Sequence, residues 1–194
     1  MKFILASKNH HKAEEIQAIL GDGFEVVTQT DAGFGDVEVI EDGKTFEENA
    51  VKKATEVMHA CGCATIADDS GLCVDALGGR PGIFTARFAG EGATDDENIS
   101  KLLSELSDVT ADRRGAKFVC VIAVAYPDGT TKTFRGECCG DILFEKSGNG
   151  GFGYDPVFRP KKYLAAMAEL PPHIKNAISH RSLALRKMRS ELGL

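Results

Sequence analysis

The chain has 194 residues, of which 43% are hydrophobic and 27% charged, a balance typical of a globular protein with a sizeable core. No apolar run approaches the roughly 20 residues that cross a bilayer, and the apolar start ends too early for a signal peptide. These features argue against a membrane protein and predict a cytoplasmic location.

Charge is distributed unevenly along the chain. The formal net charge is −6, yet residues 157–194 carry eight Lys and Arg against two Glu. A basic segment on an acidic body suits a small polyanion better than a long nucleic acid, which usually requires a broad positive face. We therefore expect no nucleic-acid partner, although a solvated helix face would give the same local charge.

Six cysteines are present at spacings that match neither a zinc site nor a disulfide framework. They are Cys61, Cys63, Cys73, Cys120, Cys138 and Cys139. We expect reduced, structural thiols, which fits a reducing compartment.

The chain opens with a strand, a polar turn and a helix. Residues 3–6 form a short apolar strand candidate, and residues 13–20 show the apolar spacing of a helix that Gly21 ends. A second strand candidate follows at residues 24–28. This arrangement places a polar turn between a buried strand and a helix start.

Two capping boxes predict the starts of further helices. Thr45 and Glu48 open the first, which Gly62 ends, and Thr94 and Glu97 open the second. In each, the Thr side chain caps the helix and the Glu side chain reaches back to it.

The remaining elements are strands of an antiparallel meander and two last helices. A short strand at 64–67 comes first and ends at Asp68; the later strand candidates are 116–126, 131–137 and 141–144, and the helices are 163–170 and 182–192, separated by Pro171-Pro172. No repeat or linker divides the chain. We therefore predict one domain over residues 1–194, an α/β fold with a mixed sheet flanked by helices.

The polar turn after the first strand predicts an anion site. Its residues are Ser7, Lys8, Asn9, His10, His11 and Lys12. A helix start presents free N–H groups and a positive dipole end, and Lys12 adds a positive charge. The glycines of a Walker A loop are absent, and the turn would look the same if it only capped a helix.

Asp68 and Asp69 predict a cation site at the end of a strand. Adjacent carboxylates suit Mg²⁺, which takes one or two carboxylates and completes its shell with phosphate and water. Glu41 and Asp42, which precede Gly43, are candidates for a further ligand. Aspartates that cap a turn are the alternative. A nucleophilic Ser70 is a weaker interpretation, because the leading glycine of G-x-S-x-G is missing.

A glycine-rich loop carries two aromatic residues and a carboxylate. The loop runs Gly151, Phe152, Gly153, Tyr154, Asp155 and Pro156. An aromatic ring between glycines can stack on a planar base, and a tight turn with aromatics in the core is the alternative. Downstream, Lys175, His180 and Arg181 approach a predicted helix start, a location that suits anions or base edges.

Taken in order, these segments resemble the inosine triphosphate pyrophosphatase family (XTP/dITP diphosphatases). The matching stretches are Ser7-x-Asn9-x-x-Lys12-x-x-Glu15, Thr45-Phe46-Glu47-Glu48-Asn49-Ala50, Ala67-Asp68-Asp69-Ser70-Gly71-Leu72, Gly78-Gly79-Arg80-Pro81-Gly82, Gly151-Phe152-Gly153-Tyr154-Asp155-Pro156 and Ile178-Ser179-His180-Arg181. They run from residue 7 to 181 and so cover essentially the whole chain. Each stretch alone is weak, but their combined order is specific.

The resemblance implies a two-lobed α/β fold with a long mixed sheet, a central cleft and a homodimer. It implies Mg²⁺-dependent hydrolysis of non-canonical purine nucleoside triphosphates (ITP, dITP and XTP) to monophosphate and pyrophosphate. Such an activity would cleanse the nucleotide pool.

The resemblance also implies residue roles, position by position. Residues 7–12 match the triphosphate-binding turn, Asp69 matches the general base and metal ligand, and Ser70 matches a substrate contact. Residues 152–155 match the base pocket, in which Phe152 stacks on the base. Lys175, His180 and Arg181 match groups that close on phosphate and base, with His180 and Arg181 at the 6-keto edge. One position departs from the family's E-E-x-G pattern, because Ile40 replaces the first acid. Glu41 is then the predicted metal ligand, and Glu38 is the alternative.

Two other functions fit parts of the sequence. A regulatory module could sense purine nucleotides without hydrolysis, and it would not need Asp69 with an acidic partner. An RNA-binding protein could use the basic tail, but residues 157–194 hold only Phe158 and Tyr163 as aromatics to stack on bases. Mg²⁺-dependent release of pyrophosphate from ITP would separate the enzyme from both.

Overall fold

The computed structural model describes residues 1–193. The chain divides into two compact units. Unit 1 comprises Met1–Asp69, Cys120–Gly136 and His180–Leu194, and unit 2 comprises Ser70–Val119 and Glu137–Ser179. The prediction of one domain over residues 1–194 stays a prediction.

Among the described residues, six strands are hydrogen-bonded in the order β2-β1-β3-β4-β5-β6. The strands are β1 (Lys2–Leu5), β2 (Glu25–Thr28), β3 (Thr65–Val74), β4 (Gly115–Ala125), β5 (Thr131–Ile142) and β6 (Phe158–Pro160). The helices are α1 (His10–Leu20), α2 (Phe46–Cys61), α3 (Asp95–Glu105), α4 (Pro172–Ile178) and α5 (His180–Glu191). Strand β1 is parallel to β2 and β3, whereas β5 and β6 are antiparallel. The predicted α/β fold with a mixed sheet flanked by helices is confirmed.

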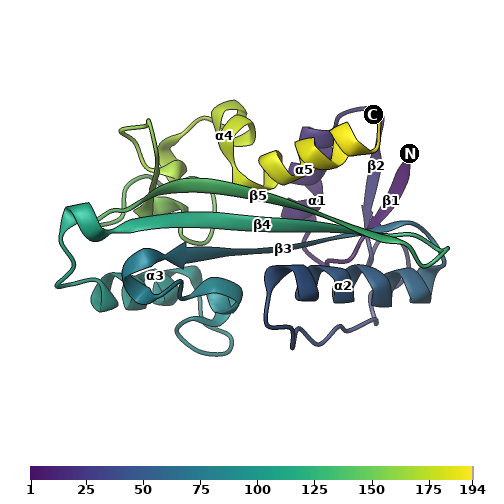
Figure 1. Ribbon diagram of the computed structural model, residues 1–194, viewed down its shortest axis with the longest axis horizontal. Helices are drawn as coiled ribbons and strands as arrows, with labels where there is room; N and C mark the ends of the chain where they lie inside the picture. Colours follow the sequence, from purple (N-terminus) through teal and green to yellow (C-terminus); the bar gives the residue numbers. More distant parts are fainter. Residues whose placement is uncertain (194) are drawn as a thin grey trace. The chain divides into compact units, whose positions relative to one another are not determined.

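In unit 1, helices cover both faces of the sheet. Helix α1 packs against α5, and these two lie on the face opposite to α2 (Figure 1). The core between the sheet and α1–α5 is apolar and fully buried, and its largest side chains include Phe3, Leu5, Ile16, Leu20 and Ile66. Burial of this core therefore determines which face of the strands α1 and α5 cover.

The helix starts follow the predicted capping chemistry with one difference. Asn9 caps α1 by accepting the Lys12 N–H at 3.2 Å, and Thr94 and Glu97 form the predicted capping box of α3. In α2, Thr45 caps as predicted, but the Glu48 carboxylate accepts the Lys44 N–H at 2.6 Å. The predicted reach back to Thr45 is therefore wrong, and Glu48 instead holds the turn that enters the helix.

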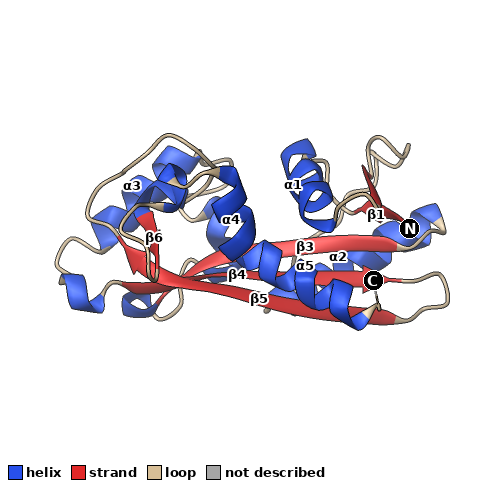
Figure 2. Cartoon of the chain, turned by 90° about the horizontal axis from the view of Figure 1, so that it is seen from above, coloured by secondary structure: helices blue, strands red, loops and turns tan. Residues whose placement is uncertain are grey.

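Unit 2 has its own core, on which α3 packs through the apolar stripe predicted from the sequence. Its fully buried side chains include Leu72, Val74, Ile99, Leu102, Leu106, Val157 and Phe158. Figure 2 distinguishes its helices, strands and long loops by colour. The helix predicted over 163–170 is wrong, because only a 3₁₀ turn forms at Met167–Glu169. Helix α4 begins instead at Pro172, since proline is favourable at the first helical position.

Two strands, β3 and β5, are longer than the sequence patterns predicted. Strand β3 continues through Asp68 and Asp69 to Val74, so the predicted strand end at Asp68 is wrong. The reason is that the carboxylates are flanked on both sides by buried apolar residues, which keep the strand inside the sheet. Likewise, β5 is one strand from Thr131 to Ile142.

No helix in the described part of the chain is long and apolar enough to cross a membrane. All six cysteines carry free thiols.

Candidate functional site

Asp68 and Asp69 point to opposite faces of the sheet, because consecutive residues of a strand alternate. Asp68 contacts Lys12 of α1 and Arg181 of α5. Asp69 contacts Lys53 of α2. Since α2 covers the other face of the strands (Figure 1), the adjacent acids enter two different charge clusters.

The Asp68 cluster is a buried set of alternating charges. The Arg181 guanidinium donates from Nε at 3.0 Å and lies with Nη2 at 2.9 Å from Asp68 Oδ2, and both side chains are 1% exposed. Lys12 Nζ donates to the other Asp68 oxygen, and Arg181 Nη1 donates to Glu15. Burial alone would raise the pKa of Asp68, but Arg181 and Lys12 outweigh it and hold that pKa well below its usual range.

The Asp69 cluster is built on one lysine. Lys53 Nζ lies 2.7 Å from Asp69 Oδ1 and 3.1 Å from Glu41 Oε2. Burial raises the pKa of Asp69 to about 6, an effect that Lys53 opposes and the Glu41 carboxylate increases. Burial disfavours the charged form of Lys53, yet Asp69 and Glu41 together raise the pKa of the ammonium.

The pKa values of the two neighbouring carboxyls therefore move in opposite directions. Asp68 is a permanent anion that holds two cations in place, whereas Asp69 titrates near neutrality. A carboxylate with a pKa close to the working pH suits general-base chemistry. Of the two acids, Asp69 has the character of a reacting group.

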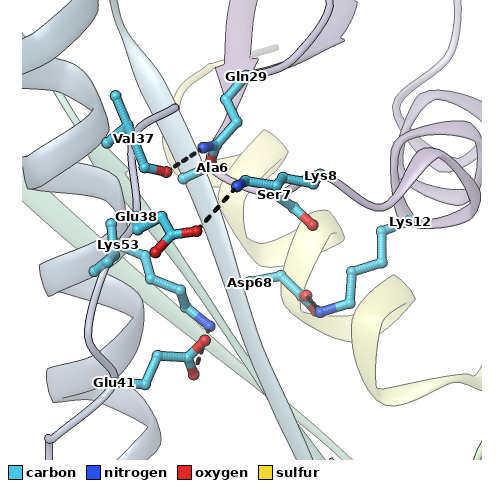
Figure 3. A pocket seen from close by; sticks show the side chains of 11 residues that line it. Ala6, Ser7, Lys8, Lys12, Gln29, Val37, Glu38, Glu41, Lys53 and Asp68 are labelled. Atoms are coloured by element: carbon cyan, nitrogen blue, oxygen red, sulfur yellow. Dashed lines mark hydrogen bonds and ion pairs between the residues drawn. The ribbon is translucent and has the colours of Figure 1, made fainter. Parts of the chain in front are cut away.

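A cavity of about 360 Å³ opens beside these clusters in unit 1 (Figure 3). Its charged and hydroxyl side chains are Ser7, Lys8, Lys12, Glu38, Glu41, Lys53 and Asp68. Ser7 Oγ accepts the Asn9 N–H at 3.1 Å, which shapes the turn into α1. Lys8 lies 3.7 Å from Glu38, with both side chains largely exposed. Lys8, which precedes α1, and Lys12, in its first turn, thus bring two ammonium groups to one polar cavity.

Three histidines, His10, His11 and His180, are among the predicted site residues. His10 Nδ1 is 3.5 Å from Asp31 Oδ2 on the exposed surface. The side chain of His11 lies outside the described part of the structure. His180 is buried, and it opens α5 as the sequence predicted. The role of His180 and Arg181 at a base edge stays a prediction.

In unit 2, the glycine-rich loop presents one aromatic ring to solvent. Phe152 is 48% exposed, and the Lys175 ammonium lies 4.7 Å from the centre of its ring. Buried Asp155 accepts from Lys175 Nζ at 2.8 Å and from the Phe152 N–H at 3.1 Å. The face of the Phe152 ring can therefore attract a cation or a polarised planar ring.

The second aromatic residue of the loop, Tyr154, fits the alternative prediction of an aromatic side chain in the core. Tyr154 is buried in the core of unit 2, and its hydroxyl donates to the Thr85 carbonyl at 2.9 Å. Burial, followed by the nearby Asp95 carboxylate, raises the pKa of this phenol. Tyr154 thus anchors the loop in the core, whereas Phe152 remains available for stacking. Ser70, a further predicted contact, lies half-buried in β3.

The donor set of unit 1 fits a hard divalent cation. Glu41 and Asp69 offer oxygen ligands, and the Lys53 ammonium that bridges them shows that the two carboxylates can share one cation. Within the described residues, no group of three or more His, Cys, Asp or Glu side chains could hold a metal ion. That is compatible with Mg²⁺, which relies on one or two carboxylates together with substrate phosphates and water.

The sequence analysis gave no role to Lys53 or to Glu15. Lys53 stands within the apolar stripe of α2, three residues after Ala50 and four before Val57, and it is only 9% exposed. A lysine on the buried side of a helix requires a partner, so its helical position was the signal. Glu15 lay in a matched stretch, but only packing reveals that it binds Arg181.

The fold and the polar cavity, which Lys8, Lys12 and Lys53 line together with Glu38, Glu41 and Asp68, define an α/β protein with a charged pocket in unit 1. The chain belongs to the Ham1 family, whose model matches residues 3–191. This confirms the resemblance that the sequence motifs indicated.

Relatives and solved structures match nearly the full chain. A dITP/XTP pyrophosphatase of Geobacter sulfurreducens is 49% identical, covering 99% of this chain and 96% of that protein. The dITP/XTP pyrophosphatase of Bacillus cereus is 46% identical, covering 97% and 93%. The Ham1 protein of Staphylococcus aureus is 41% identical, with a TM-score of 0.90 and coverage of 100% and 98%.

Proposed function

We propose that this protein hydrolyses the non-canonical purine nucleoside triphosphates ITP, dITP and XTP to the monophosphate and pyrophosphate. The observation that carries the proposal is Asp69, a buried carboxyl with a pKa raised to about 6 beside Lys53 and Glu41. The relatives that match nearly the whole chain are named dITP/XTP pyrophosphatase, which supports the same substrate class.

The phosphates would bind in the cavity of unit 1. Lys8 and Lys12 supply positive charge there, and the N-terminus of α1 supplies free N–H groups. Because Asp68 fixes Lys12, the ammonium is held in place before the substrate arrives. Such preorganised cations stabilise negative charge that develops on phosphate oxygens.

Glu41 and Asp69 would hold a Mg²⁺ ion, the cofactor we propose. Bound there, the ion would neutralise charge on the triphosphate. Lys53 stays close enough to keep Asp69 ionised at neutral pH, since its ammonium opposes the rise in the Asp69 pKa. The proposed ligands are thus Asp69 and Glu41. Glu41 takes the role of the family's first acid, a position that Ile40 occupies in this chain.

Asp69 would act as the general base. It accepts a proton from the attacking water, the oxygen of the water bonds to the α-phosphorus, and the bond to the bridging oxygen breaks. Pyrophosphate leaves with that oxygen as one group. The products are therefore nucleoside monophosphate and pyrophosphate.

The base would stack on Phe152, with Gly153, Tyr154, Asp155 and Lys175 around it. We assign the 6-keto edge to His180 and Arg181, and a substrate contact to Ser70. Arg181 is buried and paired with Asp68, so Arg181→Ala will also reduce stability. The ratio of kcat/KM for ITP to that for ATP, which a stability loss does not change, is the informative measurement; we expect it to fall about 10²-fold.

The proposal extends to the cellular setting. A single-domain enzyme that removes non-canonical nucleotides would work in the cytoplasm, where those nucleotides compete with normal ones. We propose a homodimer with no nucleic-acid or membrane partner. Size-exclusion chromatography with light scattering would test the dimer.

A panel of triphosphates tests the proposed reaction. ITP, dITP, XTP, ATP and GTP are incubated with and without Mg²⁺, and both pyrophosphate and orthophosphate are measured. We expect pyrophosphate and monophosphate from the first three only, and only with Mg²⁺. Orthophosphate with IDP as first products would contradict the proposal. Tight binding of ITP without turnover would favour a regulatory module.

A further inference from the structure

The backbone of the Phe152 loop is tied to a second element of unit 2. The Gly153 N–H donates to Asp95 Oδ2 at 2.7 Å. Asp95 is the first residue of α3, a helix start that Thr94 and Glu97 cap. The acceptor therefore stands on a rigid, capped element rather than on another loop.

Other bonds hold the residues around Gly153 within the loop or to the core of unit 2. Asp155 accepts the Phe152 N–H from within the loop, and Tyr154 reaches the Thr85 carbonyl through its side chain. Gly153 itself has φ +57°, and a Cβ added there would meet nothing within 4 Å. The carbonyl of the same peptide, on Phe152, accepts the Asp155 N–H at 3.3 Å from within the loop, so the bond to Asp95 is the one that ties this peptide to an element outside the loop.

The Asp95 bond is well suited to that task. A carboxylate acceptor makes a stronger bond to an N–H group than a neutral oxygen does. Asp95 is exposed, so removing its side chain leaves no hole in the core. A substitution at this position should therefore alter the loop without unfolding the unit.

We propose that Asp95 is a positioning residue that sets the orientation of the Phe152 ring for base stacking. This inference rests on the proposed function of the loop. Asp95 acts through the Gly153 peptide, which adjoins Phe152 directly. It should therefore control how tightly and how selectively a base binds, and leave the chemical step at Asp69 nearly unchanged.

Three full-length variants test the proposal: Asp95→Ala, Asp95→Asn and Asp96→Ala. Asn keeps an acceptor oxygen at the same position. Asp96→Ala removes the same charge from the same helical turn, but the Asp96 carboxylate pairs with Lys146 instead of the loop backbone. Two quantities are measured, hydrogen exchange of the amides of residues 152–155 and the kinetic constants for ITP.

We expect Asp95→Ala to speed exchange of the Gly153 amide about tenfold, and to raise KM for ITP about tenfold with kcat within about twofold. Asp95→Asn should restore most of both, and Asp96→Ala should match the wild type. Unchanged exchange in Asp95→Ala, or equal effects of Asp95→Ala and Asp96→Ala, would overturn the role of Asp95.

The exchange measurement separates this inference from the proposed function. If the wild-type protein hydrolyses no triphosphate, the proposed function fails, while faster exchange in Asp95→Ala still upholds the restraint on the loop. If exchange rises but KM for ITP does not, the bond is structural and the positioning role is wrong.

Discussion

Unit 1 holds the buried members of its charge clusters on regular elements, with Glu41 added from a loop, whereas unit 2 holds its exposed aromatic ring on a loop. Asp68 and Asp69 lie inside β3, and their partners Lys12, Lys53 and Arg181 lie on helices. Phe152 lies between glycines and is held by hydrogen bonds to its backbone. Chemistry that depends on tenths of an ångström needs rigid support, while a stacking platform tolerates adjustment.

Removing a side chain should have different energetic consequences in the two units. In unit 1 the side chains of Asp68, Asp69, Lys12, Lys53 and Arg181 are buried or half-buried and compensate one another, so removing one leaves its partner uncompensated. In unit 2 the Phe152 ring is half-exposed and contacts the Lys175 ammonium, so its removal should disturb that contact and whatever binds to the ring. Substitutions should therefore affect catalysis and stability in unit 1, and mainly binding in unit 2.

The largest effect should follow from Asp69→Asn. The amide keeps the shape but removes the negative charge and the basic oxygen, so kcat for ITP should fall on the order of 10³-fold. Nucleotide binding should weaken far less. Asp22→Asn, in the exposed turn after α1, is the control and should behave as wild type. Near-normal kcat for Asp69→Asn would remove this residue from the mechanism.

Asp68→Ala should chiefly destabilise the protein. It leaves Arg181 buried without a carboxylate that is itself 1% exposed and accepts from both Nε and Nη2, a change that costs about 3–5 kcal/mol. The free energy of unfolding in urea measures the loss. Asp42→Ala removes an exposed partner of Lys52 and should be nearly neutral, as is common for surface pairs. Equal stability of the two variants would refute the compensation argument.

Glu41→Gln should raise the Mg²⁺ concentration needed for half-maximal activity by about 10-fold to 100-fold. The reason is the loss of one of two proposed carboxylate ligands; even outer-shell changes at metal sites have effects of about this size. Titration calorimetry with Mg²⁺ provides a second readout independent of turnover. Glu38→Gln is the matched variant. If Glu38→Gln weakened Mg²⁺ and Glu41→Gln did not, the assignment of the ligand would be reversed.

Phe152→Ala should have the smallest and most selective effect. Loss of a stacking ring costs about 1–3 kcal/mol per base, so KM for ITP should rise about tenfold or more while kcat and stability change little. Phe152→Tyr keeps the ring and should retain a KM close to that of the wild type. A fall in kcat with unchanged KM would mean that the loop serves the chemical step instead of the base.

Local patterns in the sequence were enough to predict much of this protein. The strand, turn and helix around residues 7–12, the capping Thr45 and Thr94, and the start of α5 near His180 all depend on neighbours within a few residues. Short-range capping and apolar spacing determine such features, because the groups involved are covalently close. The family resemblance likewise rested on short local sequence motifs.

Only the tertiary structure decided what the charges do. The sequence suggested that Asp68 and Asp69 act together at a strand end, yet the length of β3 and the helices on its two faces separate them. Strand length depends on burial by distant segments, which no local pattern encodes. The raised pKa of Asp69 likewise arises from burial and from the Glu41 carboxylate, against the opposing effect of Lys53; Lys53 and Glu41 lie 16 and 28 positions earlier and meet Asp69 only in the folded chain.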